Sequence, residues 1–197
     1  MKYIYREKKQ GAPVFILLHG TGGKETDFIS LAEFLNPNYN LFGIRGKVQE
    51  NGMNRFFKRH SEGVYDWEDF DFRARELYDF IVEKSKEYDF KLEDTILVGF
   101  SNGANIALKM ILQEPDAFKK AALFSAMYPA DVKEQQDFSE LKVFLSLGKN
   151  DPLIPESESE RVTRIFRDRG ADVTTTWVQG HSLPQEAAMA AKNWLND

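Results

Sequence analysis

Cysteine is absent from this chain of 197 residues, and histidine occurs only three times. The absence of cysteine excludes disulfides, thiolate metal ligands and a cysteine nucleophile. Three scattered histidines on their own argue against a zinc site. No apolar run reaches the roughly 18 residues that a membrane-spanning helix needs, and the first nine residues contain no apolar stretch typical of a signal peptide. The sequence therefore predicts a cytoplasmic protein with no membrane span, no metal and no cofactor.

A large excess of charge of one sign is also absent. The chain has 26 Lys and Arg and 31 Asp and Glu, a net charge of -5, and its basic residues are interspersed with acidic ones. Nucleic acid is therefore not an expected partner. The length and the hydrophobic content of 42% are typical of one globular domain, which we expect to span residues 1–197.

Expected strands and helices alternate along the chain. The expected strands are Tyr3–Tyr5, Val14–Leu18, Tyr39–Ile44, Thr95–Val98, Ala121–Phe124, Val143–Leu147 and Val173–Val178. The expected helices are Glu25–Leu35, a long helix from an N-cap at Asp66 to about Tyr88, a helix that follows Ser101 and ends before Pro115, Pro155–Arg169 and Pro184–Leu195. This alternation predicts an α/β fold in which a doubly wound, mostly parallel sheet has helices on both faces. Binding sites in such sheets lie at the carboxyl ends of the strands.

A pentapeptide with a serine at its centre, Gly99-Phe100-Ser101-Asn102-Gly103, follows the apolar run Thr95–Val98 and opens a helical pattern. This is the G-x-S-x-G pattern between strand and helix, in which the serine hydroxyl stands at the tip of a sharp turn. The glycines are needed because the two backbones approach closely there. The pattern predicts that Ser101 is a nucleophile.

Two other polar residues follow later expected strands. Asp151 comes after Val143–Leu147, and His181 comes after Val173–Val178. A serine hydroxyl needs an adjacent base to attack at neutral pH. We expect His181 to take the proton of Ser101 and Asp151 to orient the imidazole. The chain order Ser, Asp, His is that of an α/β-hydrolase triad.

The negative oxygen of a tetrahedral intermediate needs preorganised hydrogen-bond donors. One expected donor is the backbone amide of Asn102, directly after the nucleophile. The second is the amide of Thr21, in the glycine-rich stretch His19–Gly23 that follows the strand Val14–Leu18. We expect His19 to orient this loop by side-chain hydrogen bonds.

The segment Asn51–Trp67 is long for a connection between a strand and a helix, and it is rich in aromatic residues. Long loops in compact domains are often functional. One interpretation is that Phe56, Phe57, Tyr65 and Trp67 line the substrate pocket. The other is that these residues form an aromatic cluster that packs the loop onto the sheet.

On these motifs the chain resembles the α/β-hydrolase superfamily over nearly its whole length, and within it the phospholipase/carboxylesterase group, which includes acyl-protein thioesterases. The similar stretches are Leu18–Gly23, Gly99–Ala104, Gly148–Pro152 and Gly180–Leu183. The stretches Arg45–Phe57 and Glu62–Asp66 are similar to a bacterial subgroup of small carboxylesterases, some of them described as hydrolases of hydroquinone or quinone stress. The resemblance implies an α/β-hydrolase fold, and no connection is long enough for a separate cap domain. It also implies a serine hydrolase that cleaves small or aromatic acyl esters through an acyl-enzyme, and a monomer or homodimer.

Two positions depart from the thioesterase pattern, because Asn102 and Thr21 stand where those enzymes typically have Gln and Leu. Two alternatives to the esterase stay open. One is a thioesterase or lysophospholipase with the same triad, and the other is a non-catalytic binding protein with this fold.

Overall fold

The computed structural model describes residues 1–197 and contains a central sheet of seven strands. The strands are β1 (Tyr3–Arg6), β2 (Val14–Leu18), β3 (Asn40–Ile44), β8 (Thr95–Phe100), β9 (Lys120–Phe124), β10 (Lys142–Lys149) and β11 (Asp172–Gln179). Their order across the sheet is β1-β3-β2-β8-β9-β10-β11. All neighbours are parallel except β1, which pairs antiparallel with β3. The expected, mostly parallel sheet is confirmed, with β11 at one edge.

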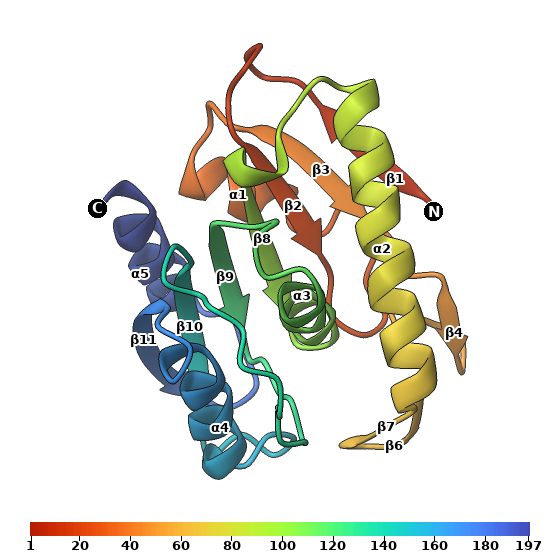
Figure 1. The fold of residues 1–197 in the computed structure, drawn as a ribbon, viewed down its shortest axis with the longest axis vertical. Helices are drawn as coiled ribbons and strands as arrows, with labels where there is room; N and C mark the ends of the chain where they lie inside the picture. The colour runs from red at the N-terminus through yellow and green to blue at the C-terminus, as the bar shows by residue number, and fades with distance from the viewer.

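Helices cover both faces of the sheet (Figure 1). The helices are α1 (Ile29–Leu35), α2 (Trp67–Glu87), α3 (Asn102–Gln113), α4 (Glu156–Arg167) and α5 (Gln185–Asn196), with a short 3-10 turn, η1 (Leu92–Asp94), before β8. Helices α2, α3 and α4 lie in front of the sheet in Figure 1, and α1 and α5 lie behind it. The resulting three-layer arrangement leaves the carboxyl ends of the parallel strands at one end of the molecule.

The apolar strands are buried because both faces of the sheet are covered. Alternate residues of β2 enter different clusters: Val14, Ile16 and Leu18 join the larger one under α2, α3 and α4, whereas Phe15 and Leu17 join the smaller one under α1 and α5. Every residue of β2 is buried. Each large apolar side chain buried in this way contributes about 1.5–3 kcal/mol, which explains why the strand reads as one continuous apolar run.

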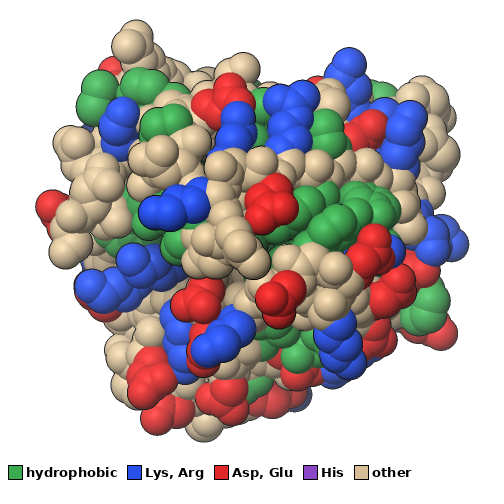
Figure 2. Space-filling view, turned by 90° about the horizontal axis from the view of Figure 1, so that it is seen from above, with side chains coloured by type: hydrophobic (Ala, Val, Ile, Leu, Met, Phe, Trp, Pro, Cys, Tyr) green, Lys and Arg blue, Asp and Glu red, His purple; other side chains and the backbone are tan.

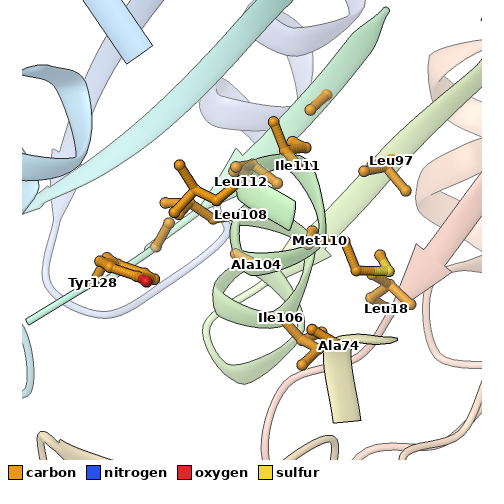
Figure 3. Packing of buried hydrophobic residues seen from close by; sticks show 14 of the residues in the cluster. Leu18, Ala74, Leu97, Ala104, Ile106, Leu108, Met110, Ile111, Leu112 and Tyr128 are labelled. Carbon is orange, nitrogen blue, oxygen red and sulfur yellow. The ribbon is translucent and has the colours of Figure 1, made fainter. Parts of the chain in front are cut away.

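Helix α3 is the most enclosed helix, with ten of its twelve residues buried. It packs against strand β8 of the sheet and against its neighbour α2 on the same face. Figure 3 shows Leu18 and Leu97 from the strands and Ala74 from α2 around Ala104, Ile106 and Met110 of this helix. The packing fixes the position of the first turn of α3, which begins directly after Ser101.

Two features differ from the sequence-based expectation. The helix expected over Glu25–Leu35 begins only at Ile29, because residues 25–28 form turns. The buried Glu25 carboxylate there lies 2.5 Å from Nε of Arg45. The segment before α2 contains two hairpins that were not expected. They are β4 (Val48–Glu50) with β5 (Met53–Arg55), and β6 (Arg59–Ser61) with β7 (Val64–Tyr65). The expected N-cap is confirmed, since the Asp66 carboxylate accepts from the amide of Asp69 at 3.1 Å.

A cleft of about 630 Å³ lies at the amino ends of the parallel strands, where Tyr5, Tyr88 and Phe90 are among its lining residues. Figure 2 looks onto this end of the molecule, where apolar side chains are visible between mixed basic and acidic ones. This cleft lies at the opposite end of the sheet from Ser101. None of the helices is both long enough and apolar enough to cross a membrane.

Candidate active site

Ser101 occupies a strained turn between β8 and α3. Its backbone angles are φ 50° and ψ -115°, a conformation that non-glycine residues rarely adopt. The Ser101 amide donates to the Phe124 carbonyl at 2.8 Å, which ties the turn to the neighbouring strand β9. Strain of this kind persists only where the surrounding structure holds it, and it is concentrated at functional sites.

The glycines on either side of the turn allow the strand and the helix to approach each other. A Cβ atom on Gly99 would stand 2.7 Å from the amide nitrogen of Ala104, too close for any real side chain. Gly103 lies against the backbone of Leu18 and His19 with even less space. The turn therefore requires glycine at both positions.

The structure brings Ser101, Asp151 and His181 together at the carboxyl ends of β8, β10 and β11. Nε2 of His181 lies 2.9 Å from Oγ of Ser101, and Nδ1 of His181 lies 2.8 Å from Oδ2 of Asp151. The Asp151 side chain is 1% exposed, and that of His181 is 14% exposed. One imidazole thus joins a buried carboxylate to a hydroxyl that stands at the tip of a strained turn.

Asp151 is fixed by the loop that follows it. Its Oδ1 accepts from the amides of Leu153 at 2.8 Å and Ile154 at 3.1 Å. These bonds leave Oδ2 free to accept from His181. The centroid of the Phe100 ring lies 5.2 Å from that of the His181 ring.

His19 holds the glycine-rich loop through both of its ring nitrogens. Nδ1 donates to the Gly20 carbonyl at 2.6 Å, and Nε2 accepts from the Gly46 amide at 3.0 Å. A neutral imidazole satisfies both bonds, with the proton on Nδ1. Burial lowers the pKa of His19, against the smaller opposing effect of the Gly20 carbonyl. The expectation that His19 orients this loop agrees with these contacts.

The two amides expected to hold an oxyanion come from different elements. The Asn102 amide opens α3, so it has no acceptor within the helix. Thr21 is exposed in the loop after β2, and its amide donates to no backbone or side-chain acceptor. Both amides are thus available as donors beside the serine turn.

Of the four aromatic residues expected to line a pocket, the structure buries three. Phe56, Phe57 and Tyr65 are 4%, 0% and 3% exposed, and only Trp67, at 36%, has substantial free surface. The rings of Phe57 and Tyr65 contact that of Phe70 on α2, at centroid distances of 4.1 and 5.3 Å. Such burial is what the packing interpretation expects, because a fully buried ring has no surface to offer a substrate.

Two residues near the site did not stand out in the sequence. Asn105, on the first turn of α3, donates from Nδ2 to the Tyr65 hydroxyl at 2.7 Å and accepts from the Met127 amide at 2.8 Å. Arg55 is 4% exposed and contacts Thr21. Arg55 lies in the stretch Arg45–Phe57 that carries the family resemblance, but no pattern in that stretch marks it for a contact with Thr21, and an arginine is usually exposed. The contacts of both residues are with partners distant in sequence, so only the folded structure identifies them.

No group of three or more His, Cys, Asp or Glu side chains is arranged to hold a metal ion.

Comparison with known sequences gives one family for the whole chain. The profile of the Phospholipase/Carboxylesterase family matches residues 1–197. The chain is also 46% identical over 198 residues to MhqD of Bacillus subtilis (strain 168), whose name assigns it to the hydrolases. That match covers 100% of this chain and 98% of the relative.

Comparison with solved structures gives the same result. The carboxylesterase of Bacillus cereus is similar with a TM-score of 0.96 and 38% identity, over 100% of this chain and 93% of that one. YahD, solved with malic acid, is similar with a TM-score of 0.95 and 31% identity, over 99% of this chain and 98% of that one. The fold is therefore that of bacterial carboxylesterases, without a separate cap.

Proposed function

The chain belongs to the phospholipase/carboxylesterase family of α/β-hydrolases, and we propose that it is a serine esterase that cleaves carboxylic esters through an acyl-enzyme. One observation carries the proposal: His181 lies within hydrogen-bond distance of both Ser101 Oγ and Asp151 Oδ2. A base placed between a hydroxyl and a buried carboxylate can activate that hydroxyl.

In the first half of the reaction, Oγ of Ser101 attacks the ester carbonyl carbon while Nε2 of His181 takes the hydroxyl proton. The carboxylate of Asp151 accepts from Nδ1 and stabilises the imidazolium that forms. The new bond joins Oγ to the acyl carbon. The bond to the leaving alcohol then breaks, and the alcohol oxygen takes the proton from Nε2.

In the second half, a water molecule attacks the acyl-enzyme and gives its proton to His181. The Oγ–acyl bond breaks, and Ser101 recovers the proton as the carboxylic acid leaves. In both halves the carbonyl oxygen becomes negative, and the amides of Thr21 and Asn102 donate to it. Donors that are already in position before the reaction stabilise this charge without any reorganisation. Removal of one such donor lowers kcat by about 10²–10³-fold.

We propose small or aromatic acyl esters as the substrate class. YahD, solved with malic acid, is a relative associated with a small carboxylic acid, which supports compact substrates. The lack of a separate cap is in keeping with this class, because a deep tunnel for a long lipid chain needs additional structure. Trp67 is the remaining aromatic candidate for substrate contact, with 36% of its surface exposed.

Hydrolysis of p-nitrophenyl esters with acyl chains of two to twelve carbons tests this function. We expect turnover that is highest for short chains and that is lost in Ser101→Ala. Pairs of oxygen and thio esters with the same acyl group separate an esterase from a thioesterase, because the two classes would rank each pair in opposite order. Wild-type protein that binds these esters without cleaving any of them would overturn the proposed activity in favour of a binding protein.

A further inference from the structure

One short segment of the chain holds the loop that contains Thr21. The Gly22 amide donates to the Asn54 carbonyl at 2.9 Å, and Nδ2 of Asn54 donates to the Gly23 carbonyl at 2.7 Å. The adjacent Arg55 donates from Nη1 to Oγ1 of Thr21 at 2.7 Å. Residues 54 and 55 therefore contact three consecutive residues of the glycine-rich loop.

The Arg55 guanidinium is fixed as well as buried. Its Nε lies 3.1 Å from Oε2 of Glu50 and 3.3 Å from the Phe57 carbonyl, and its side chain is 4% exposed. Burial, and then the charge of Arg59, lower the pKa of Arg55, whereas Glu50 raises it. Removing an arginine from water is costly, and a planar guanidinium held at two points has little freedom left. Arg55 can therefore hold Thr21 rigidly.

The same segment also reaches the second oxyanion donor. The amide of Phe56, the residue after Arg55, donates to Oδ1 of Asn102 at 2.7 Å. Asn102 is 2% exposed, so this bond is buried. Thr21 and Asn102 lie on separate elements, and the consecutive residues 55 and 56 bind both of their side chains. The segment therefore fixes the two elements relative to each other.

We propose that Arg55 is a positioning residue that sets the geometry of the oxyanion hole through its hydrogen bond to Thr21. The inference rests on the proposed esterase function and assigns to it a residue outside the triad. The effect follows because a donor stabilises the oxyanion only when it is already aimed at the place where the charge develops. Arg55 acts through Thr21 and does not touch the substrate.

A double-mutant cycle between Arg55→Met and Thr21→Val tests this role, with kcat and KM measured on a short p-nitrophenyl ester. Each variant removes one side of the same bond. We expect each to lower kcat by about 10- to 100-fold, which does not exceed the kcat loss caused by removing one oxyanion donor completely. KM should change by less than about twofold. The double variant should lose no more than the larger single loss.

Two further variants separate this bond from other effects. Thr21→Ser keeps an acceptor oxygen and should recover most of the kcat that Thr21→Val loses. Arg59→Met is the matched control, because Arg59 also contacts Glu50 at 3.0 Å but is not bonded to Thr21; it should keep the wild-type kcat. Thr21 is exposed, so its variants remain informative even where Arg55→Met fails to fold.

The outcomes distinguish this inference from the proposed function. A wild-type kcat in both Arg55→Met and Thr21→Val, beside a loss in Ser101→Ala, overturns the positioning role and leaves the esterase intact. Additive losses in the double variant would also overturn it, because the two side chains would then act independently. An inactive wild type would overturn the esterase and the positioning role together.

Discussion

Gly103 lies so close to Leu18 that a Cβ atom placed on it would stand 2.0 Å from the Leu18 carbonyl oxygen. This contact joins the first turn of α3 to the end of β2, and it brings the serine turn next to the loop of Thr21. No side-chain adjustment can relieve this clash, because the atoms it meets belong to the backbone of Leu18 and His19. The approach of these elements is therefore possible only with glycine at position 103.

Gly103→Ala should destabilise the protein by at least about 3 kcal/mol, in the range of severe core substitutions. The reason is steric, since α3 would have to move away from β2. Urea denaturation followed by circular dichroism measures the effect. Gly52→Ala is the matched control, because Gly52 has open space around it and a φ of 80°, so only the backbone conformation is disfavoured, at about 1–2 kcal/mol. Equal losses in the two variants would contradict the steric account.

Asp151→Asn should lower kcat by about 10³–10⁴-fold with little change in stability. Oδ1 of Asp151 accepts from two backbone amides, so the amide group of an asparagine would face His181 in place of Oδ2. Nδ1 of His181 would then accept from the asparagine amide, so the imidazole would carry its proton on Nε2. Nε2 is the nitrogen that must accept the proton of Ser101. Steady-state kinetics measure the loss. The exposed Asp172→Asn serves as a control for the charge change, and a loss of similar size in it would count against a specific role for Asp151.

Phe57→Ala should reduce the free energy of unfolding by about 3–5 kcal/mol and leave KM unchanged. The ring is fully buried against Phe70, so its removal leaves a cavity in the core and alters no surface that a substrate can reach. Thermal unfolding and KM for an aromatic ester are the two measurements. Phe57→Leu provides a milder form of the same test. A raised KM with unchanged stability would restore the pocket interpretation.

His19 should make the protein less stable in acid. The pKa of His19 is lowered in the folded state, so between that value and the ordinary value of about 6.5 the unfolded chain binds more protons than the folded one. Stability therefore rises with pH in this window. It is at its full value above about pH 6.5 and is lost as pH falls towards the folded pKa, by at most about 1.4 kcal/mol per pH unit for one proton.

Urea denaturation at pH 7.5 and pH 5 checks this expectation. The difference in unfolding free energy between the two pH values should shrink in His19→Gln and stay at the wild-type size in His60→Gln, which alters an exposed histidine. If His19→Gln kept the full wild-type difference, the acid sensitivity would have to come from other groups.

The architecture could be predicted from sequence because its elements are long and regular. Runs such as Val14–Leu18 are apolar throughout, which identifies them as strands. The alternation of strands and helices then places Ser101 and His181 at the carboxyl ends of parallel strands, at the same end of the sheet. Local chemistry also identified the start of α2, where Asp66 caps the helix. These features depend on residues close together in the sequence or on a topology with few alternatives.

The segment between β3 and α2 could not be predicted in the same way. Its strands have two or three residues, too few for an alternating pattern to emerge. Its aromatic residues have no periodicity that distinguishes a pocket lining from a packed core. The burial of Phe57 also depends on its contact with Phe70 of α2, which comes after it in the sequence. The role of Arg55 depends on a contact 34 residues away in sequence. Only the folded structure brings these groups together.

Covalent labelling tests the central claim, that Ser101 is activated by His181. Wild-type protein and Ser101→Ala are each treated with a fluorophosphonate probe and analysed by intact mass. An activated serine should give one adduct on the wild type and none on Ser101→Ala, with labelling strongly slowed in His181→Ala. Folded wild-type protein that forms no adduct, or an adduct that persists in Ser101→Ala, would contradict the account.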